Sequence, residues 1–170
     1  MSGARVIPRY TPRMPTPREH HFECLLTWTG ASRGSTTSYD TYSREVLVEI
    51  DGKPPLAGSA APPFRGDGKL HNPEDLLVAA LSECHCLSYL ALAARAGVVV
   101  AGYEDRATGT LAMIEGKFRF REVTLRPRVL VMPGVSVDQA RALHEKAHSE
   151  CFIASSVNFP VKNEPEILVK

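Results

Sequence analysis

The sequence predicts an α+β fold in a single domain. Its expected strands and helices come in blocks, whereas a parallel sheet of βαβ units would alternate them. One long helix with clear start signals lies near the middle of the chain, over residues 72–97. No glycine-rich phosphate loop follows any expected strand. The length of 170 residues is enough for one domain with its own hydrophobic core.

The composition excludes several classes of function. The formal net charge is +1, and a near-neutral chain argues against nucleic acid as a partner, because phosphate binding needs a concentrated basic face. No run approaches the ~20 apolar residues of a membrane span, so we expect none. The four cysteines come without an export signal, which favours the reducing cytoplasm over a disulfide framework.

Residues 1–19 form a Pro/Arg-rich N-terminal arm, and residues 20–170 form the expected domain. Prolines alternate with arginines in this arm, so it cannot form a regular helix or a central strand. We expect a loose arm, or a strap laid over a partner subunit.

The first part of the domain is expected to be strand and loop. Residues 20–29 and 39–50 are predicted strands, and the second is closed by the Asp51-Gly52 turn signal. Residues 53–70 carry several prolines and glycines and are predicted to be one long loop. Long ordered loops are often functional, and this one contains Arg65.

The helix over residues 72–97 has the best-defined boundaries. Asn72 is a good N-cap, Pro73 suits the first helical position, and Gly97 marks the end. Apolar residues, with Cys84 among them, cover most of its circumference. We therefore expect it to be buried nearly all round, as a central helix or at a subunit interface.

The C-terminal part is predicted to contain a hairpin, a helix and a last strand. Residues 98–112 and 118–132 form the long hairpin around a turn at 115–117. Ser136 caps a helix that runs through His148, with Gln139 in the capping-box position. A short helical piece over 151–157 and a final strand over 161–169 complete the domain.

The cysteines have different expected settings. Cys24 lies among apolar strand residues and is expected to be a buried structural thiol. Cys84 and Cys86 are two apart on a helix, so they point roughly 200° apart around its axis and cannot act together on one metal. Cys151 follows the second helix. On spacing alone, Cys84 and Cys86 are more often core residues than chemical ones.

A metal site and a redox couple are the two chemical alternatives. His144, His148 and Cys151 fall on one helical face and could bind zinc, with Cys84 as a fourth ligand. A redox role instead needs a Cys84 thiolate, and Cys84 lies too deep in its helix for the helix dipole to help. A cation must then come from elsewhere: Arg65 first, Arg33 second and Arg44 third by position in the sequence.

With these residues in view, the chain resembles the OsmC/Ohr family of osmotically inducible and organic hydroperoxide resistance proteins. The run Asn72-Pro73-Glu74-Asp75-Leu76 matches the family's N-P-E-x-L pattern, and Cys84 stands ten residues after its glutamate. Phe64-Arg65-Gly66 looks like the family's arginine loop, and Cys151 stands at its second cysteine. Phe152 replaces the proline that often follows that cysteine, and Cys86 is an additional thiol, as in a less typical OsmC-like branch.

The resemblance implies antiparallel sheets wrapped around a central buried helix, in an intertwined homodimer. It implies a thiol peroxidase without metal or cofactor, in which Cys84 attacks an organic hydroperoxide and forms a sulfenic acid. Cys151 then closes a Cys84–Cys151 disulfide that an external dithiol reduces. By the match, Arg65 stabilises the thiolate and Glu74 orients the arginine, with Arg33 as the alternative arginine.

Helix geometry adds an expectation about the subunits. Glu74 and Cys84 lie roughly 15 Å apart along one straight helix, at about 1.5 Å per residue. Glu74 cannot organise the sulfur of its own chain over that distance, so a site that uses both needs a second, antiparallel copy. Two alternatives to the peroxidase stay open: a non-enzymatic dimer that binds a small hydrophobic ligand or a partner, and the zinc-binding module.

Overall fold

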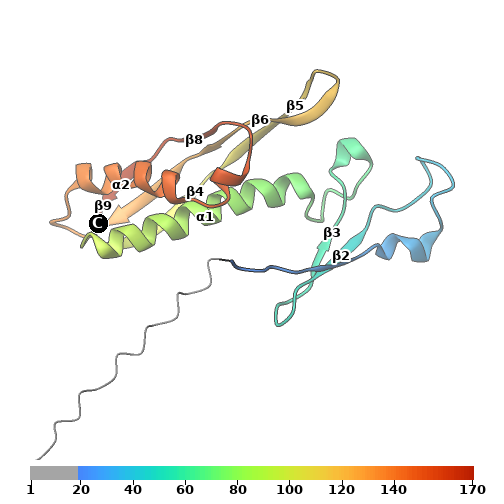
Figure 1. Cartoon of the computed structure of the whole chain (residues 1–170), viewed down its shortest axis with the longest axis horizontal. Coiled ribbons are helices and arrows are strands. Elements are labelled where there is room, and N and C mark those ends of the chain that lie inside the picture. Colours follow the sequence, from blue (N-terminus) through green and yellow to red (C-terminus); the bar gives the residue numbers. More distant parts are fainter. Residues whose placement is uncertain (1–18) are drawn as a thin grey trace, which may run out of the picture.

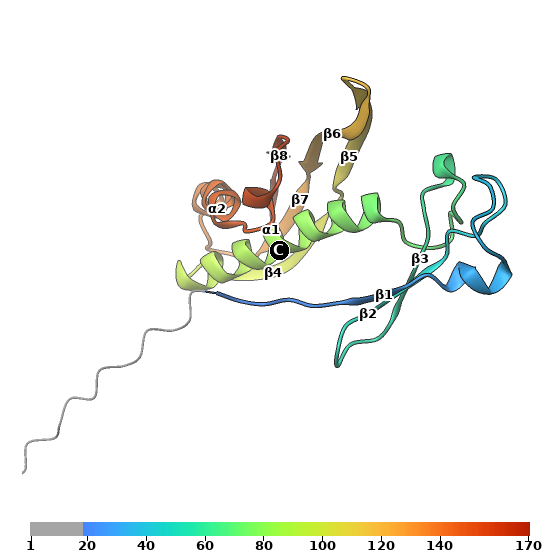
Figure 2. The ribbon, with the colours of Figure 1, turned by 45° about the vertical axis from the view of Figure 1, so that its right-hand side comes forward.

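The computed structural model describes residues 19–170, so the predicted arm lies outside the described residues except for Glu19. The long helix α1, Pro73–Arg95, runs through the middle of the molecule (Figure 1). The strands β4 to β9 and helix α2 lie along one side of it. The strands β1 to β3 lie beyond its N-terminal end, so the fold has two parts joined by α1 (Figures 1 and 2).

Helix α1 begins and ends as the sequence predicts. The Asn72 side chain accepts a hydrogen bond from the backbone N–H of Asp75 at 2.9 Å, and Pro73 takes the first helical position. The helix ends at Arg95, and Gly97 has the left-handed φ of +71° that favours glycine after a helix.

Within this single chain helix α1 is buried along one face, so the expected burial nearly all round would need a subunit interface. Its buried side chains are Leu81, His85, Tyr89, Leu92 and Ala93. The opposite face exposes large apolar side chains, and Leu87 is 59% exposed. By length and composition α1 could also cross a membrane, contrary to the sequence expectation, although the core helix of a soluble protein passes the same test.

Two three-stranded sheets and one helix pack beside α1. The first sheet has the order β4-β7-β9 and the second β5-β6-β8. The bounds are β4 Val100–Asp105, β5 Thr108–Ile114, β6 Lys117–Leu125, β7 Pro127–Val131, α2 Val137–Glu150, β8 Val161–Asn163 and β9 Glu166–Val169. The predicted hairpin is present, but it is divided into the pairs β4–β7 and β5–β6.

The predicted last strand is likewise two strands, and each adds a parallel pair to sheets whose other pairs are antiparallel. Strand β8 pairs parallel to β6, and β9 pairs parallel to β7. Helix α2 forms the crossover connection between β7 and these last two strands. Because of this crossover, β8 and β9 can run in the same direction as the strands that they pair with. Helix α2 is capped as predicted, because the Ser136 side chain accepts from the Gln139 N–H.

The N-terminal sheet differs most from the prediction. It consists of β1, Leu25–Thr27, β2, Val46–Glu49, and β3, Leu56–Gly58. The two predicted strands are therefore shorter than expected. The predicted loop over 53–70 contains β3 and the short 3-10 helix η2, Pro62–Phe64; another 3-10 helix, η1, covers Thr29–Arg33.

The N-terminal sheet is largely uncovered by the rest of its own chain. All three residues of β1 are exposed, and Leu25 and Leu26 are among the exposed large apolar side chains. Cys24 is exposed as well, so the prediction that it is a buried structural thiol is wrong for this chain alone. The apolar pattern predicted burial, but within residues 19–170 the side chains of Cys24, Leu25 and Leu26 are left exposed.

Candidate active site

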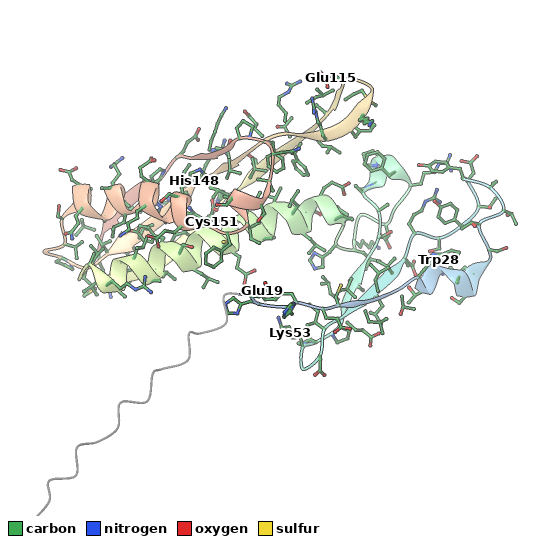
Figure 3. The ribbon with its side chains drawn as sticks, in the orientation of Figure 1. Glu19, Trp28, Lys53, Glu115, His148 and Cys151 are labelled. Carbon is green, nitrogen blue, oxygen red and sulfur yellow. The ribbon has the colours of Figure 1, made fainter. Side chains whose placement is uncertain are left out.

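Cys84 and Cys151 lie side by side, although 67 residues separate them in the sequence. Cys84 is half-buried in the middle of α1, and Cys151 follows the last residue of α2 and is only 1% exposed. Cys84 is close enough to Cys151 to contribute to the raised pKa of the Cys151 thiol. Figure 3 shows Cys151 above the middle of α1. The two cysteines are free thiols in this structure.

The protein holds Cys151 in its protonated form. Burial is the main cause, and together with the neighbouring Cys84 it raises the pKa of the Cys151 thiol to about 11. A backbone hydrogen bond from the Ala154 N–H to the sulfur, at 3.5 Å, acts in the opposite direction. Cys151 is therefore a poor first nucleophile at neutral pH, which suits a thiol that reacts second.

Cys86 belongs to another environment. It lines a cavity of about 650 Å³ between α1 and strands β4 to β6, and Cys84 and Cys151 do not line that cavity. Burial, followed by the carboxylates of Asp105 and Glu83, raises the pKa of the Cys86 thiol. The extra thiol next to Cys84 in sequence thus points away from the Cys84–Cys151 pair, as helix geometry predicts.

Two buried histidines lie beside the cysteine pair, and the sequence reasoning missed their contact. His85 Nε2 and His144 Nδ1 are 3.0 Å apart, and both side chains are 0% exposed. Burial, then the nearby His148, lowers the pKa of His85 to about 4. Burial, then His85 and Arg141, lowers that of His144 to about 3. The available signal was a histidine on the apolar face of a helix, directly after Cys84.

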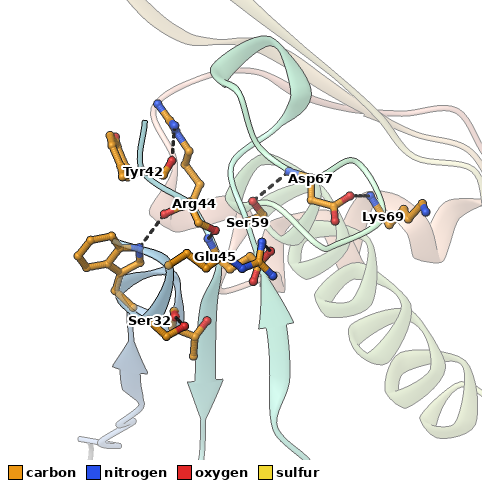
Figure 4. Close-up of polar contacts among 11 residues, drawn as sticks. Ser32, Tyr42, Arg44, Glu45, Ser59, Asp67 and Lys69 are labelled. Atoms are coloured by element: carbon orange, nitrogen blue, oxygen red, sulfur yellow. Dashed lines mark hydrogen bonds and ion pairs between the residues drawn. The ribbon is translucent and has the colours of Figure 1, made fainter. Parts of the chain in front are cut away.

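The three candidate arginines are gathered in the N-terminal part of the molecule. Arg65 pairs with Asp40 at 3.0 Å and is 53% exposed, and Arg33 pairs with Glu45 at 2.8 Å. Arg44 stacks on the ring of Tyr42 and donates to the Tyr42 carbonyl (Figure 4). All three line one cavity of about 410 Å³, which Cys84 does not line.

The loop that carries Arg65 depends on a close backbone contact, and this gives a first prediction. A Cβ at Gly66 would lie 1.5 Å from the Ala60 carbonyl oxygen. We expect Gly66→Ala to displace this loop and to lower the free energy of unfolding by about 1–3 kcal/mol, measured by urea denaturation. Gly68→Ala is the matched control, because its Cβ would meet only the Pro62 ring at 3.1 Å. Equal stability of the two variants would contradict the prediction.

Glu74 lies at the N-terminal end of α1, beside the arginine region. It lines an apolar cavity of about 480 Å³ together with Trp28, Tyr42, Arg44 and Phe64. Its Oε2 atom is buried and has no hydrogen-bond partner within residues 19–170. A buried carboxylate oxygen without a donor is costly, so this site favours a donor supplied from outside the described residues.

The predicted site residues therefore form two separate groups in one chain. Cys84 and Cys151 make one group at the α1–α2 contact, while Glu74, Arg65 and Arg33 lie at the N-terminal end of α1 or beyond it. The ten-residue spacing on a continuous α1 keeps Glu74 about 15 Å from Cys84 along the helix axis.

The structure does not assemble the zinc site that the sequence left open. The Nδ1 atom of His144 is hydrogen-bonded to His85, and Cys151 interacts with Cys84. Within residues 19–170, no group of three or more histidine, cysteine, aspartate or glutamate side chains could hold a metal ion.

Comparisons with known proteins identify the family and the fold. The sequence profile of the OsmC-like protein family matches residues 66–166. An OsmC-like protein of unknown function from Vibrio cholerae is 34% identical, with a TM-score of 0.78 over 86% of this chain and 99% of that one. The uncharacterized protein YmaD of Bacillus subtilis is 24% identical over 89% of this chain and 96% of its own length.

A more distant structure shows the same fold. It is an organic hydroperoxide resistance protein from Elizabethkingia anophelis, 22% identical, with a TM-score of 0.66 over 92% of this chain and all of that one. The profile match covers more than half of the residues, and the Vibrio cholerae protein matches over nearly its whole length. The chain therefore belongs to the OsmC/Ohr family, whose members include organic hydroperoxide resistance proteins.

Proposed function

We propose that this protein is a cysteine-based thiol peroxidase that reduces organic hydroperoxides and works as a homodimer. The single observation that carries the proposal is the proximity of Cys84, on α1, to the buried Cys151, directly after α2, both free thiols. Family membership supports the substrate class. The four free cysteines fit a cytoplasmic location, where thiols stay reduced.

The proposed reaction has two steps within the protein. The Cys84 thiolate attacks a peroxide oxygen, the O–O bond breaks, and the alkoxide leaves as an alcohol after taking up a proton. This leaves Cys84 as a sulfenic acid. The Cys151 sulfur then displaces the hydroxyl from Cys84, its own proton leaves with that hydroxyl as water, and the disulfide forms. An external dithiol returns both residues to thiols by exchange.

Three observations support a homodimer whose sites lie between the subunits. The exposed face of α1 is apolar, and only 28% of its most apolar 18-residue stretch is buried. The N-terminal sheet is uncovered. Glu74 has an unpartnered buried oxygen, while Arg33 and Arg65 lie in the group without the cysteines. An antiparallel partner would bring the arginine group of one chain to the cysteine pair of the other.

A mixing experiment tests the shared site. Cys84→Ser and Glu74→Ala subunits, each inactive alone, are unfolded together and refolded in equal amounts. Random pairing makes about half of the dimers mixed, and each mixed dimer has one intact site of two. We expect peroxide consumption to return to about one quarter of the wild-type rate. A mixture as inactive as its components would contradict the shared site.

The alternative function is a non-enzymatic dimer that binds a small hydrophobic ligand, and the apolar cavity beside Glu74 is the observation in its favour. The two functions differ in whether they require the Cys84 sulfur. A binding protein keeps its ligand when Cys84 is replaced, whereas a peroxidase loses its reaction.

A further inference from the structure

Three contacts between α1 and α2 fix how the two helices lie against each other. Cys84 meets Cys151, His85 meets His144, and the Tyr89 hydroxyl donates to the Ala140 carbonyl at 3.2 Å. The α1 number rises from one contact to the next while the α2 number falls, so the helices run antiparallel. The cysteine contact is the last of the three, at the end of α2.

The histidine contact joins the two helices by a directional bond in a dry environment. Both rings are 0% exposed, and they are nearly parallel, at 12°. The Tyr89 ring stacks on His144 with centroids 4.0 Å apart. In a neutral pair one nitrogen donates and the other accepts, so the bond holds for either assignment of the proton.

Each ring depends on the other for its hydrogen bonding. His85 Nδ1 and His144 Nε2 are both buried and have no partner among the described residues. The bond between the two rings is thus the only one that either side chain makes in residues 19–170. Sliding one helix along the other would leave two more polar atoms unsatisfied in the core, which is costly.

We propose that His85 is a positioning residue for the Cys84–Cys151 couple: its hydrogen bond to His144 fixes the register of α1 against α2 in which the two sulfurs meet. Because His85 is the residue next to Cys84, a displacement of α1 at the histidine contact also displaces the Cys84 sulfur. His144 lies two turns of α2 before Cys151, which directly follows the last residue of that helix, so the position of α2 sets the position of Cys151. The inference rests on the cysteine couple of the proposed function.

Two double variants with the same composition test this register. A glutamine amide reaches about as far as imidazole Nε2, and an asparagine amide about as far as Nδ1. His85→Gln with His144→Asn therefore keeps the two polar atoms in reach of each other. The swapped pair, His85→Asn with His144→Gln, contains the same two amides. Its side chain at position 85 is too short to reproduce His85 Nε2, and its side chain at position 144 is too long to reproduce His144 Nδ1.

The measurement is the equilibrium between the full-length protein and a dithiothreitol redox buffer, with the Cys84–Cys151 disulfide quantified by mass spectrometry. We expect the matched pair to form the disulfide within threefold of wild type. We expect the swapped pair to form it at least tenfold less readily, which corresponds to a rise of about 30 mV in reduction potential. Tyr89→Phe removes a different α1–α2 hydrogen bond, and we expect a change below threefold.

Several outcomes would overturn the inference. Equal reduction potentials for the matched and swapped pairs would do so. A tenfold loss of disulfide formation in the matched pair would also overturn it, and this result can be read even if the swapped pair fails to fold. A loss in Tyr89→Phe equal to that of the swapped pair would show that any weakened contact between these helices has the same effect. The assay uses no peroxide. A protein that forms the disulfide as expected but consumes no peroxide would contradict the proposed function and leave the positioning role intact.

Discussion

Cys84→Ser is expected to lower the rate of organic hydroperoxide consumption to below about a thousandth of the wild-type rate. A serine hydroxyl is not ionised at neutral pH, whereas the attacking species in this chemistry is the thiolate. The measurement is the loss of an organic hydroperoxide in the presence of a dithiol, with wild type and variant compared at equal protein concentration. Retained consumption would remove Cys84 from the reaction.

The other cysteines provide matched controls for this result. Cys86→Ser is expected to leave the rate within about twofold, because Cys86 lines a different cavity, and Cys24→Ser likewise because its thiol is exposed in the N-terminal sheet. Cys151→Ser should still consume about one equivalent of peroxide per subunit and then stop with oxidised Cys84. This pattern separates the attacking thiol from the resolving thiol, and a general loss of activity in all four variants would contradict it.

The two helices followed from local sequence rules, whereas the proximity of Cys84 and Cys151 was implied only by the resemblance to the family. Asn72 and Ser136 cap their helices through their own side chains, so the start of each helix is encoded within one turn. The family pattern placed Cys84 and Cys151 in one site, and the fold brings their thiols together. Local signals are sufficient for the two helix starts because each cap depends on residues only a few positions apart.

The burial of the N-terminal sheet and of α1 could not be predicted in the same way. The apolar patterns around Cys24 and Leu87 indicate surfaces that must be covered, but they do not say by which chain. The hydrogen bond between His85 and His144 joins residues 59 apart in sequence, so no local sequence pattern predicts it. A histidine on an apolar helix face shows only that a polar partner is needed.

This histidine pair also leads to a prediction about stability in acid. The folded protein lowers the pKa of His85 to about 4 and that of His144 to about 3, mainly through burial, whereas an unfolded histidine keeps a pKa near 6.5. Below pH 6.5 the unfolded chain therefore binds more protons than the folded one. Stability is fully present above that pH and is lost progressively as the pH falls toward about 4.

The charged groups around the histidine pair do not offset this loss of stability at low pH. His148 and Arg141 disfavour a further positive charge, and Tyr89 and Tyr103 carry no charge at these pH values because burial raises the pKa of each hydroxyl. Asp105 favours protonation of His85, but its carboxylate already accepts hydrogen bonds from Ser82 and the Arg126 N–H. Each histidine is thus expected to cost about 2 kcal/mol at pH 5, about 4 kcal/mol for the pair.

A loss of about 4 kcal/mol is a large part of the 5–15 kcal/mol that stabilises a typical domain. It should appear in urea unfolding at pH 7.5 and pH 5.0, at one fixed protein concentration because the proposed dimer would add a dependence on concentration. The double variant His85→Gln with His144→Asn cannot titrate at these positions, so its loss between the two pH values should be smaller than that of wild type by about 4 kcal/mol. His71→Gln, which removes an exposed imidazole, should lose as much as wild type does. The same loss in the double variant as in wild type would show that this pair is not what acid destabilises, because only its removal distinguishes these two proteins.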